Sequence, residues 1–191
     1  MDIIGTIRGA PLVDLAIFLG LFLFFILGVM QGSIRRILGI ISILFAFLMA
    51  ANLRAPVGDF LAQNWTQFSP GYDHLLAFTV VFCVGAVASS ILIQGLYKRT
   101  EIYAAHPVVD DIVGGLLGLL QGLLLLIIAV IILNSYILPP PQSGDVDQLR
   151  QAQNLIVHQS AIAGGVKDVI VPPFVHALSI LLPPDLVATF P

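Results

Sequence analysis

The chain has 191 residues, of which 58% are hydrophobic and only 10% are charged, and its formal net charge is -3. Ordinary soluble domains carry about 25% charged residues, so this composition, with a mean hydropathy of +1.01, excludes a typical soluble domain and predicts an integral membrane protein. The scattered charges argue against a nucleic-acid partner, and the single cysteine, Cys83, excludes a disulfide within the chain.

The first half of the chain predicts two membrane spans. Residues 1–14 predict a short interfacial or mobile segment rather than a cleaved signal peptide. The first span covers 15–31, with Asp14 placed to cap its start, and the second covers 37–53. One helix over both spans would be about 58 Å long, nearly twice the hydrocarbon thickness, so we expect a turn beside Gly32. The second span is short, and a re-entrant helix is the alternative.

The second half of the chain predicts a long loop at 54–74, a third span at 75–97, a fourth span at 112–138 and a tail at 139–191. Prolines punctuate the tail, and its amphipathic stretches are too short to cross a bilayer. We therefore expect the tail to lie on the membrane face or to fold back on the bundle. The predicted fold class is all-α, an integral membrane four-helix bundle with small-residue (Gly/Ala/Ser) packing faces and a C-terminal amphipathic tail.

Glycines spaced four residues apart mark the expected packing faces. Gly114, Gly118 and Gly122 share one face of the fourth span, and Gly28 and Gly32 share a face at the end of the first. Membrane helices gain little hydrophobically by touching one another, and they associate where small residues let backbones approach closely. We expect these faces to pack helices together, and to support self-association or contact with other membrane proteins in the lipid bilayer.

Lysines and arginines near the span ends predict the orientation. Cytoplasmic loops carry an excess of these residues. The loops that follow the first and third spans hold Arg35, Arg36, Lys98 and Arg99. We therefore expect both loops in the cytoplasm and both termini outside it.

Motifs of catalysis and of metal or phosphate binding do not occur in the sequence, so we expect no enzymatic activity, no cofactor and no metal. Asp110 is interpreted as structural: it would cap the fourth helix and meet a basic residue at the cytoplasmic surface. Polar side chains inside the spans would either line a pore or join helices by hydrogen bonds. They are Ser42, Thr79, Ser89, Ser90, Gln94 and Gln121.

Two segments resemble motifs of the colicin V production (CvpA) family of bacterial inner-membrane proteins. The stretch Gly28–Arg35 resembles the glycine-arginine motif that ends the first helix of that family. Asp110–Gly122 resembles its aspartate followed by a Gly/Leu-rich helix. Asp14 at the start of the first span and Ser160 ahead of an apolar tail segment also fit.

The resemblance implies a four-span bundle with no established catalytic activity. It also implies a role in colicin V (bacteriocin) production or export and in envelope homeostasis. Gln31 and Gln121 stand where many members have a basic residue, and Asp111 stands where an arginine often follows the aspartate. The alternatives are an oligomeric channel or small-solute transporter, and a structural subunit of a larger membrane complex.

Overall fold

The computed structural model describes residues 3–64, 70–96, 107–136, 154–158 and 160–190. The long helices in these ranges are α1 (Ile3–Gln31), α2 (Ser33–Asn64), α3 (Pro70–Leu96) and α5 (Pro107–Tyr136). Each contains a stretch long and apolar enough to cross a membrane, at Leu12–Gln31, Ser33–Asn64, Asp73–Ile93 and Val108–Asn134. The predicted all-α fold with four membrane-spanning helices is thereby confirmed.

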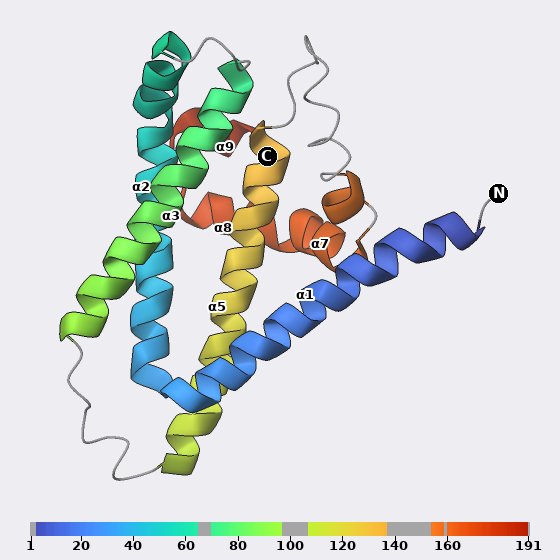
Figure 1. The fold of residues 1–191 in the computed structure, drawn as a ribbon, viewed down its shortest axis with the longest axis vertical. Helices are drawn as coiled ribbons and strands as arrows, with labels where there is room; N and C mark the ends of the chain where they lie inside the picture. The colour runs from blue at the N-terminus through green and yellow to red at the C-terminus, as the bar shows by residue number, and fades with distance from the viewer. Residues whose placement is uncertain (1–2, 65–69, 97–106, 137–153, 159, 191) are drawn as a thin grey trace.

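The long helices pack as two pairs joined through α5. α2 and α3 run antiparallel along one another, and α5 packs against both α2 and α1 (Figure 1). α1 crosses α5 near the α1–α2 turn and then diverges, so its N-terminal part leaves the bundle at an angle. The turn is made by Gly32 with φ +78°, a left-handed conformation that glycine adopts without a steric cost. The turn and the first residues of α5 lie at the same end of the bundle.

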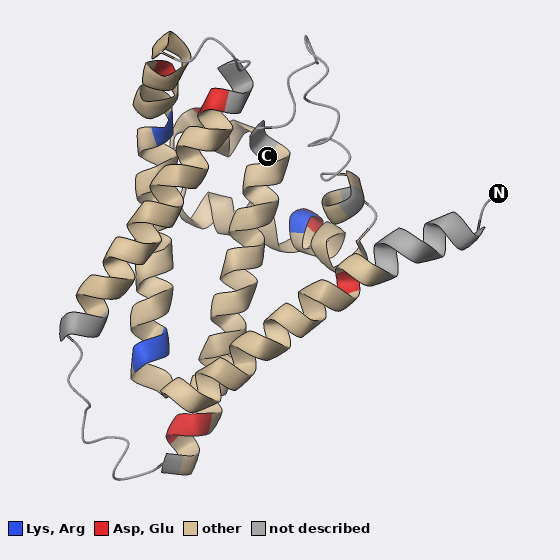
Figure 2. Cartoon of the chain, viewed as in Figure 1, with Lys and Arg blue, Asp and Glu red and all other residues tan. Residues whose placement is uncertain are grey.

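Among the described residues, Asp14 lies within α1 and Arg54 within α2, and the other charged residues lie nearer the helix ends or in the tail. Figure 2 shows long stretches of α2, α3 and α5 without Lys, Arg, Asp or Glu, as expected for segments that face hydrocarbon. Many apolar side chains on α1 and α3 are exposed, among them Phe18, Phe22, Val84 and Ile91. In a bilayer these surfaces contact lipid, so their exposure does not require a protein partner.

All four long helices begin before the spans predicted from the sequence, and α1 and α2 extend furthest beyond them. α1 is helical from Ile3, so Asp14 lies in the middle of a helix and does not cap its start. α2 continues through Pro56 to Asn64, and α3 begins at Pro70, so the loop predicted at 54–74 is much shorter. Proline removes one backbone hydrogen bond, but helices that pack against a neighbour tolerate that loss.

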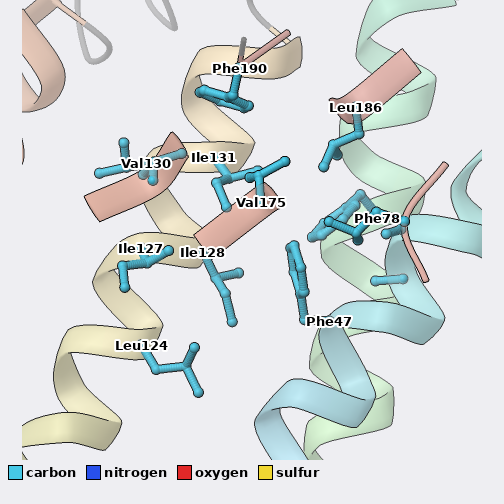
Figure 3. Packing of buried hydrophobic residues seen from close by; sticks show 14 of the residues in the cluster. Phe47, Phe78, Leu124, Ile127, Ile128, Val130, Ile131, Val175, Leu186 and Phe190 are labelled. Carbon is cyan, nitrogen blue, oxygen red and sulfur yellow. The ribbon is translucent and has the colours of Figure 1, made fainter. Parts of the chain in front are cut away.

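The tail folds back on the bundle. Its described part contains short helical elements: η1 (Asn154–His158), α7 (Ala161–Gly165), η2 (Val166–Ile170), α8 (Val171–Ala177) and α9 (Pro184–Ala188). Val175, Leu186 and Phe190 of the tail lie between α5 and the α2–α3 pair (Figure 3). They pack against Ile128 and Ile131 of α5 on one side, and against Phe47 and Phe78 on the other. Of the two placements expected from the sequence, the structure shows the second.

The tail fills the interior of the bundle with apolar side chains. Val171 and Val175 are completely buried, and Leu186 is 1% exposed. The Phe47 ring lies 6.0 Å from the rings of both Phe78 and Phe174, so aromatic contacts join α2, α3 and α8. This apolar layer separates one end of the bundle from the cavity described next.

Candidate functional site

A mainly apolar cavity of about 620 Å³ with several polar lining residues lies among the four long helices. Its polar lining residues are Gln31, Arg35, Arg36, Ser42, Ser90 and Gln121. Of the six residues considered as pore-lining from the sequence, three line this cavity. Thr79 and Ser89 instead donate to the carbonyls of Leu75 and Gly85 within α3, and the side chain of Gln94 lies outside the described residues.

Arg36 is the central charged group of the cavity. It is 4% exposed, and its Nη1 donates to Oε1 of Gln121 at 2.7 Å. The amide of Gln121 also lies against Gly39, where an added Cβ would be 3.1 Å from Nε2. The absence of a side chain at Gly39 therefore makes room for Gln121 beside α2. The Arg36–Gln121 bond joins α2 to α5 one turn after α2 begins.

Asp110 holds the turn between α1 and α2. Its Oδ1 accepts from the backbone N–H of Ser33 at 3.1 Å and also from the Ser33 hydroxyl. Asp110 therefore caps the N-terminus of α2, whereas the sequence analysis expected it to cap its own helix. It does not pair with Arg35 or Arg36. The other expected partners, Lys98 and Arg99, lie outside the described residues.

Glycines make the contact between α1 and α5. A Cβ added at Gly114 would lie 2.6 Å from the Gly28 carbonyl oxygen and 3.1 Å from the Gly32 Cα. One added at Gly118 would lie 3.0 Å from the Gly28 Cα, and one at Gly122 would lie 3.1 Å from the Phe24 Cβ. The backbones approach so closely that no side chain fits between them. The α5 glycine face is thus occupied by α1 of the same chain.

Asp14 fastens the tail to α1. Its carboxylate accepts from the Ser160 hydroxyl and, at 3.2 Å each, from the backbone N–H groups of Ala161 and Ile162. Ser160 is the N-cap of α7 and in turn accepts from Ala163 N at 3.0 Å. The same arrangement therefore occurs twice: an aspartate on one long helix accepts from a serine and a backbone N–H at the start of another helix.

Two further contacts attach the tail to α2. Arg54 forms an ion pair with Asp185 of α9. The Asn52 side chain donates to the Leu181 carbonyl at 3.0 Å. The tail is therefore held by polar contacts on both sides of its buried apolar face.

Seven of the eight site residues predicted from the sequence lie along the α1–α5 contact and at the α1–α2 turn. They are Gly28, Gly32, Arg35, Asp110, Gly114, Gly118 and Gly122, while Asp14 lies apart from them and contacts the tail. Ser33 and Arg36 were not among the predicted site residues, although Arg36 was expected in a basic loop at the cytoplasmic surface. A signal existed for Arg36, because Gly39 lies three residues later on the same face of α2.

The described residues contain no group of three His, Cys, Asp or Glu side chains that could hold a metal ion. His74 lies 3.7 Å from Asp59 and 3.5 Å from the Arg54 carbonyl, next to Gly58 on α2. Because Gly58 lacks a side chain, the imidazole ring can lie directly against α2. This contact joins α2 and α3 at the end of the bundle opposite the cavity.

A family model described as Colicin V production protein matches residues 13–171. The match covers most of the chain and includes Asp14, Asp110 and Ser160. Neither the comparison with curated proteins nor the comparison with solved structures found a match.

Proposed function

The chain belongs to the colicin V production protein family, and from that premise we propose a non-enzymatic, multi-pass protein of the bacterial inner membrane that serves colicin V production or export and envelope homeostasis. The observation that supports this proposal is the position of the tail inside the bundle. The tail closes the bundle with apolar packing, through residues such as Val175 and Leu186, where a solute path would need polar groups. Such a bundle is suited to act through its surface.

The charged groups support a structural role for the polar residues. Asp110 and Asp14 each accept hydrogen bonds at the start of another helix, and Asp185 pairs with Arg54. A carboxylate engaged in this way is held by its donors and stabilises the fold. We propose that these carboxylates hold the helices and the tail in place.

For orientation, we propose that the α1–α2 turn and the segment between α3 and α5 face the cytoplasm, with both termini outside. The basic residues of those two segments support this orientation. The α1–α2 turn and the first residues of α5 lie at the same end of the bundle in Figure 1. Under this orientation the cavity around Arg36 lies near the cytoplasmic surface.

For partners, we propose self-association or contact with other membrane proteins through α1. The α5 glycine face packs against α1, but Gly20 of α1 has no atom within 4 Å of an added Cβ. Gly20 shares a helix face with Leu23, which is 54% exposed, so a neighbouring helix could approach there closely.

The alternative function is an oligomeric channel or small-solute transporter. The observation in its favour is the cavity, which Ser42, Ser90 and Gln121 line with polar groups inside the predicted spans. A continuous path would require the tail to leave its position between α5 and the α2–α3 pair.

Two measurements test the proposed function. In a colicin V-producing host, deletion of the gene should lower secreted colicin V and raise an envelope-stress reporter, and the wild-type chain should restore both. Purified protein in liposomes should release no entrapped small solutes above the rate of protein-free liposomes. If the wild type released solute and the cavity-filling variant Ala86→Phe did not, the channel would be favoured. If deletion of the gene changed neither colicin V secretion nor the stress reporter, the proposed role would be contradicted.

A further inference from the structure

Arg36 carries unused hydrogen-bond donors inside the bundle. Its Nη1 donates to Gln121, but its buried Nε and Nη2 have no hydrogen-bond partner in the described structure. Gln121 is neutral, so it satisfies one donor without balancing the positive charge. A buried charge without a counter-ion is costly, and the cost falls when an anion supplies both the charge and the acceptors.

The unused donors form one edge of the guanidinium group. Nε and Nη2 carry N–H bonds that point in parallel from the same side of the planar group, which is the arrangement that binds two oxygens of a phosphate or carboxylate. Nη1 on the other side is held by Gln121. Gln121 thereby holds one side of the guanidinium, and the paired edge is buried beside the cavity without an acceptor.

The cavity has the size and charge of an anion site. Its volume of about 620 Å³ lies within the range of about 300–1,000 Å³ that small-molecule sites have. Arg35 and Arg36 both line it, and no Asp or Glu does. Phe24, Phe82 and Leu125 add apolar walls.

The cavity also extends to the outer surface of the helices. Val87 and Ile91 of α3 line it and are 59% and 66% exposed. A ligand can therefore enter from the side, where lipid surrounds the bundle. Arg36 lies one turn after the start of α2, so in a bilayer we expect it near the headgroups. Basic pockets between helices at that depth bind anionic lipid headgroups.

We propose that this cavity binds the phosphate group of an anionic ligand, with Nε and Nη2 of Arg36 as the donors and Arg35 as a second positive charge. The phosphate belongs either to an anionic phospholipid headgroup that enters between α1 and α3 or to a soluble phosphate. This site goes beyond the proposed function and does not rest on it.

The test uses the full chain purified in a neutral, phosphate-free detergent. Binding is measured by native mass spectrometry and by the shift of the thermal unfolding midpoint. The separate additions are phosphatidylglycerol, phosphatidylcholine and inorganic phosphate. Arg36→Gln removes the charge, and Ala86→Phe fills the cavity wall while keeping Arg36. Lys167→Gln is the control, because it removes a charge outside the cavity.

The wild type and Lys167→Gln should bind phosphatidylglycerol in preference to phosphatidylcholine. Arg36→Gln should bind it about tenfold more weakly, as expected for the loss of a charge-assisted hydrogen-bond pair. Ala86→Phe should lose binding as well. If Arg36→Gln does not fold, Ala86→Phe alone tests whether the lipid binds in this cavity. Inorganic phosphate alone could raise the thermal unfolding midpoint of the wild type and not that of either cavity variant. This result would support the site, with a soluble phosphate as its ligand. Equal binding by the wild type and both cavity variants, or no binding by the wild type, would overturn the proposal.

Discussion

The backbone N–H and the hydroxyl of Ser33 both donate to Oδ1 of Asp110, which lies 77 residues later in the chain. The first N–H groups of a helix have no partner within it, and a side-chain acceptor there stabilises the helix. In this protein that acceptor comes from another helix. The cap of α2 therefore also fixes the position of α5 against the α1–α2 turn.

Replacing Asp110 should destabilise the bundle through this cap. Asp110→Ala removes both acceptor contacts and should lower the free energy of unfolding by about 1–2 kcal/mol, whereas Asp110→Asn keeps an acceptor oxygen and should cost less. Thermal unfolding in mild detergent measures both effects. Asp111→Ala is the matched control, and an equal loss for Asp110→Ala and Asp111→Ala would contradict the capping role.

Gly118→Leu should disrupt the contact between α1 and α5. An added Cβ would meet the Phe24 carbonyl oxygen and lie 3.0 Å from the Gly28 Cα, so two backbones would have to separate. Overpacking of this kind typically costs about 1–3 kcal/mol. The variant should lose folded protein in size-exclusion chromatography in mild detergent.

Two substitutions serve as controls for Gly118→Leu. Gly20→Leu adds the same side chain where an added Cβ has no neighbour within 4 Å, and Leu119→Ile changes an exposed position. Both variants should remain folded. If Gly118→Leu behaved as Gly20→Leu does, the close approach of α1 and α5 would be refuted.

Asp14 and Ser160 should be energetically coupled. Asp14→Ala removes the acceptor for three donors at the start of α7, and Ser160→Ala removes one of those donors and the helix cap. Each variant should expose residues 154–190 to limited proteolysis. The double variant should lose less unfolding free energy than the sum of the losses in the two single variants, by about 0.5 kcal/mol or more. Asp168 is an exposed carboxylate of the tail, so Asp168→Ala is the control and should leave the proteolysis pattern unchanged. If the losses of unfolding free energy in the two single variants simply added, a direct contact between Asp14 and Ser160 would be contradicted.

The orientation can be tested with reporters active only in the periplasm. A reporter fused after Gly144 should be active and one fused within residues 100–105 should be inactive, because basic loops stay in the cytoplasm. Both fusion points lie outside the described residues, so this prediction rests on the sequence. The opposite pattern would place the tail in the cytoplasm.

The sequence predicted the long helices because about 20 consecutive apolar residues have few other structures available. The spacing of Gly114, Gly118 and Gly122 also placed them on one helix face, and the structure puts that face against α1. These features are local, and the residues that determine them lie within a few turns of one another.

The pairings across the chain were not predictable in the same way. Asp110 can reach Ser33 only because α1 and α5 cross where their glycines meet, and that crossing is a property of the fold. Asp14 was expected to cap its own helix, since a carboxylate before an apolar run usually does so. The structure instead continues α1 on the N-terminal side of Asp14, which leaves its carboxylate to the tail.

The contact between Asp14 and Ser160 has a consequence for biosynthesis. Ser160 follows Asp14 by 146 residues, so the ribosome adds Asp14 long before its partner. The tail can therefore dock only after every long helix has been translated. A chain that stops before Ser160 would leave Phe47, Phe78 and Ile128 without the side chains that cover them. Docking of the tail is thus the step that covers these apolar side chains.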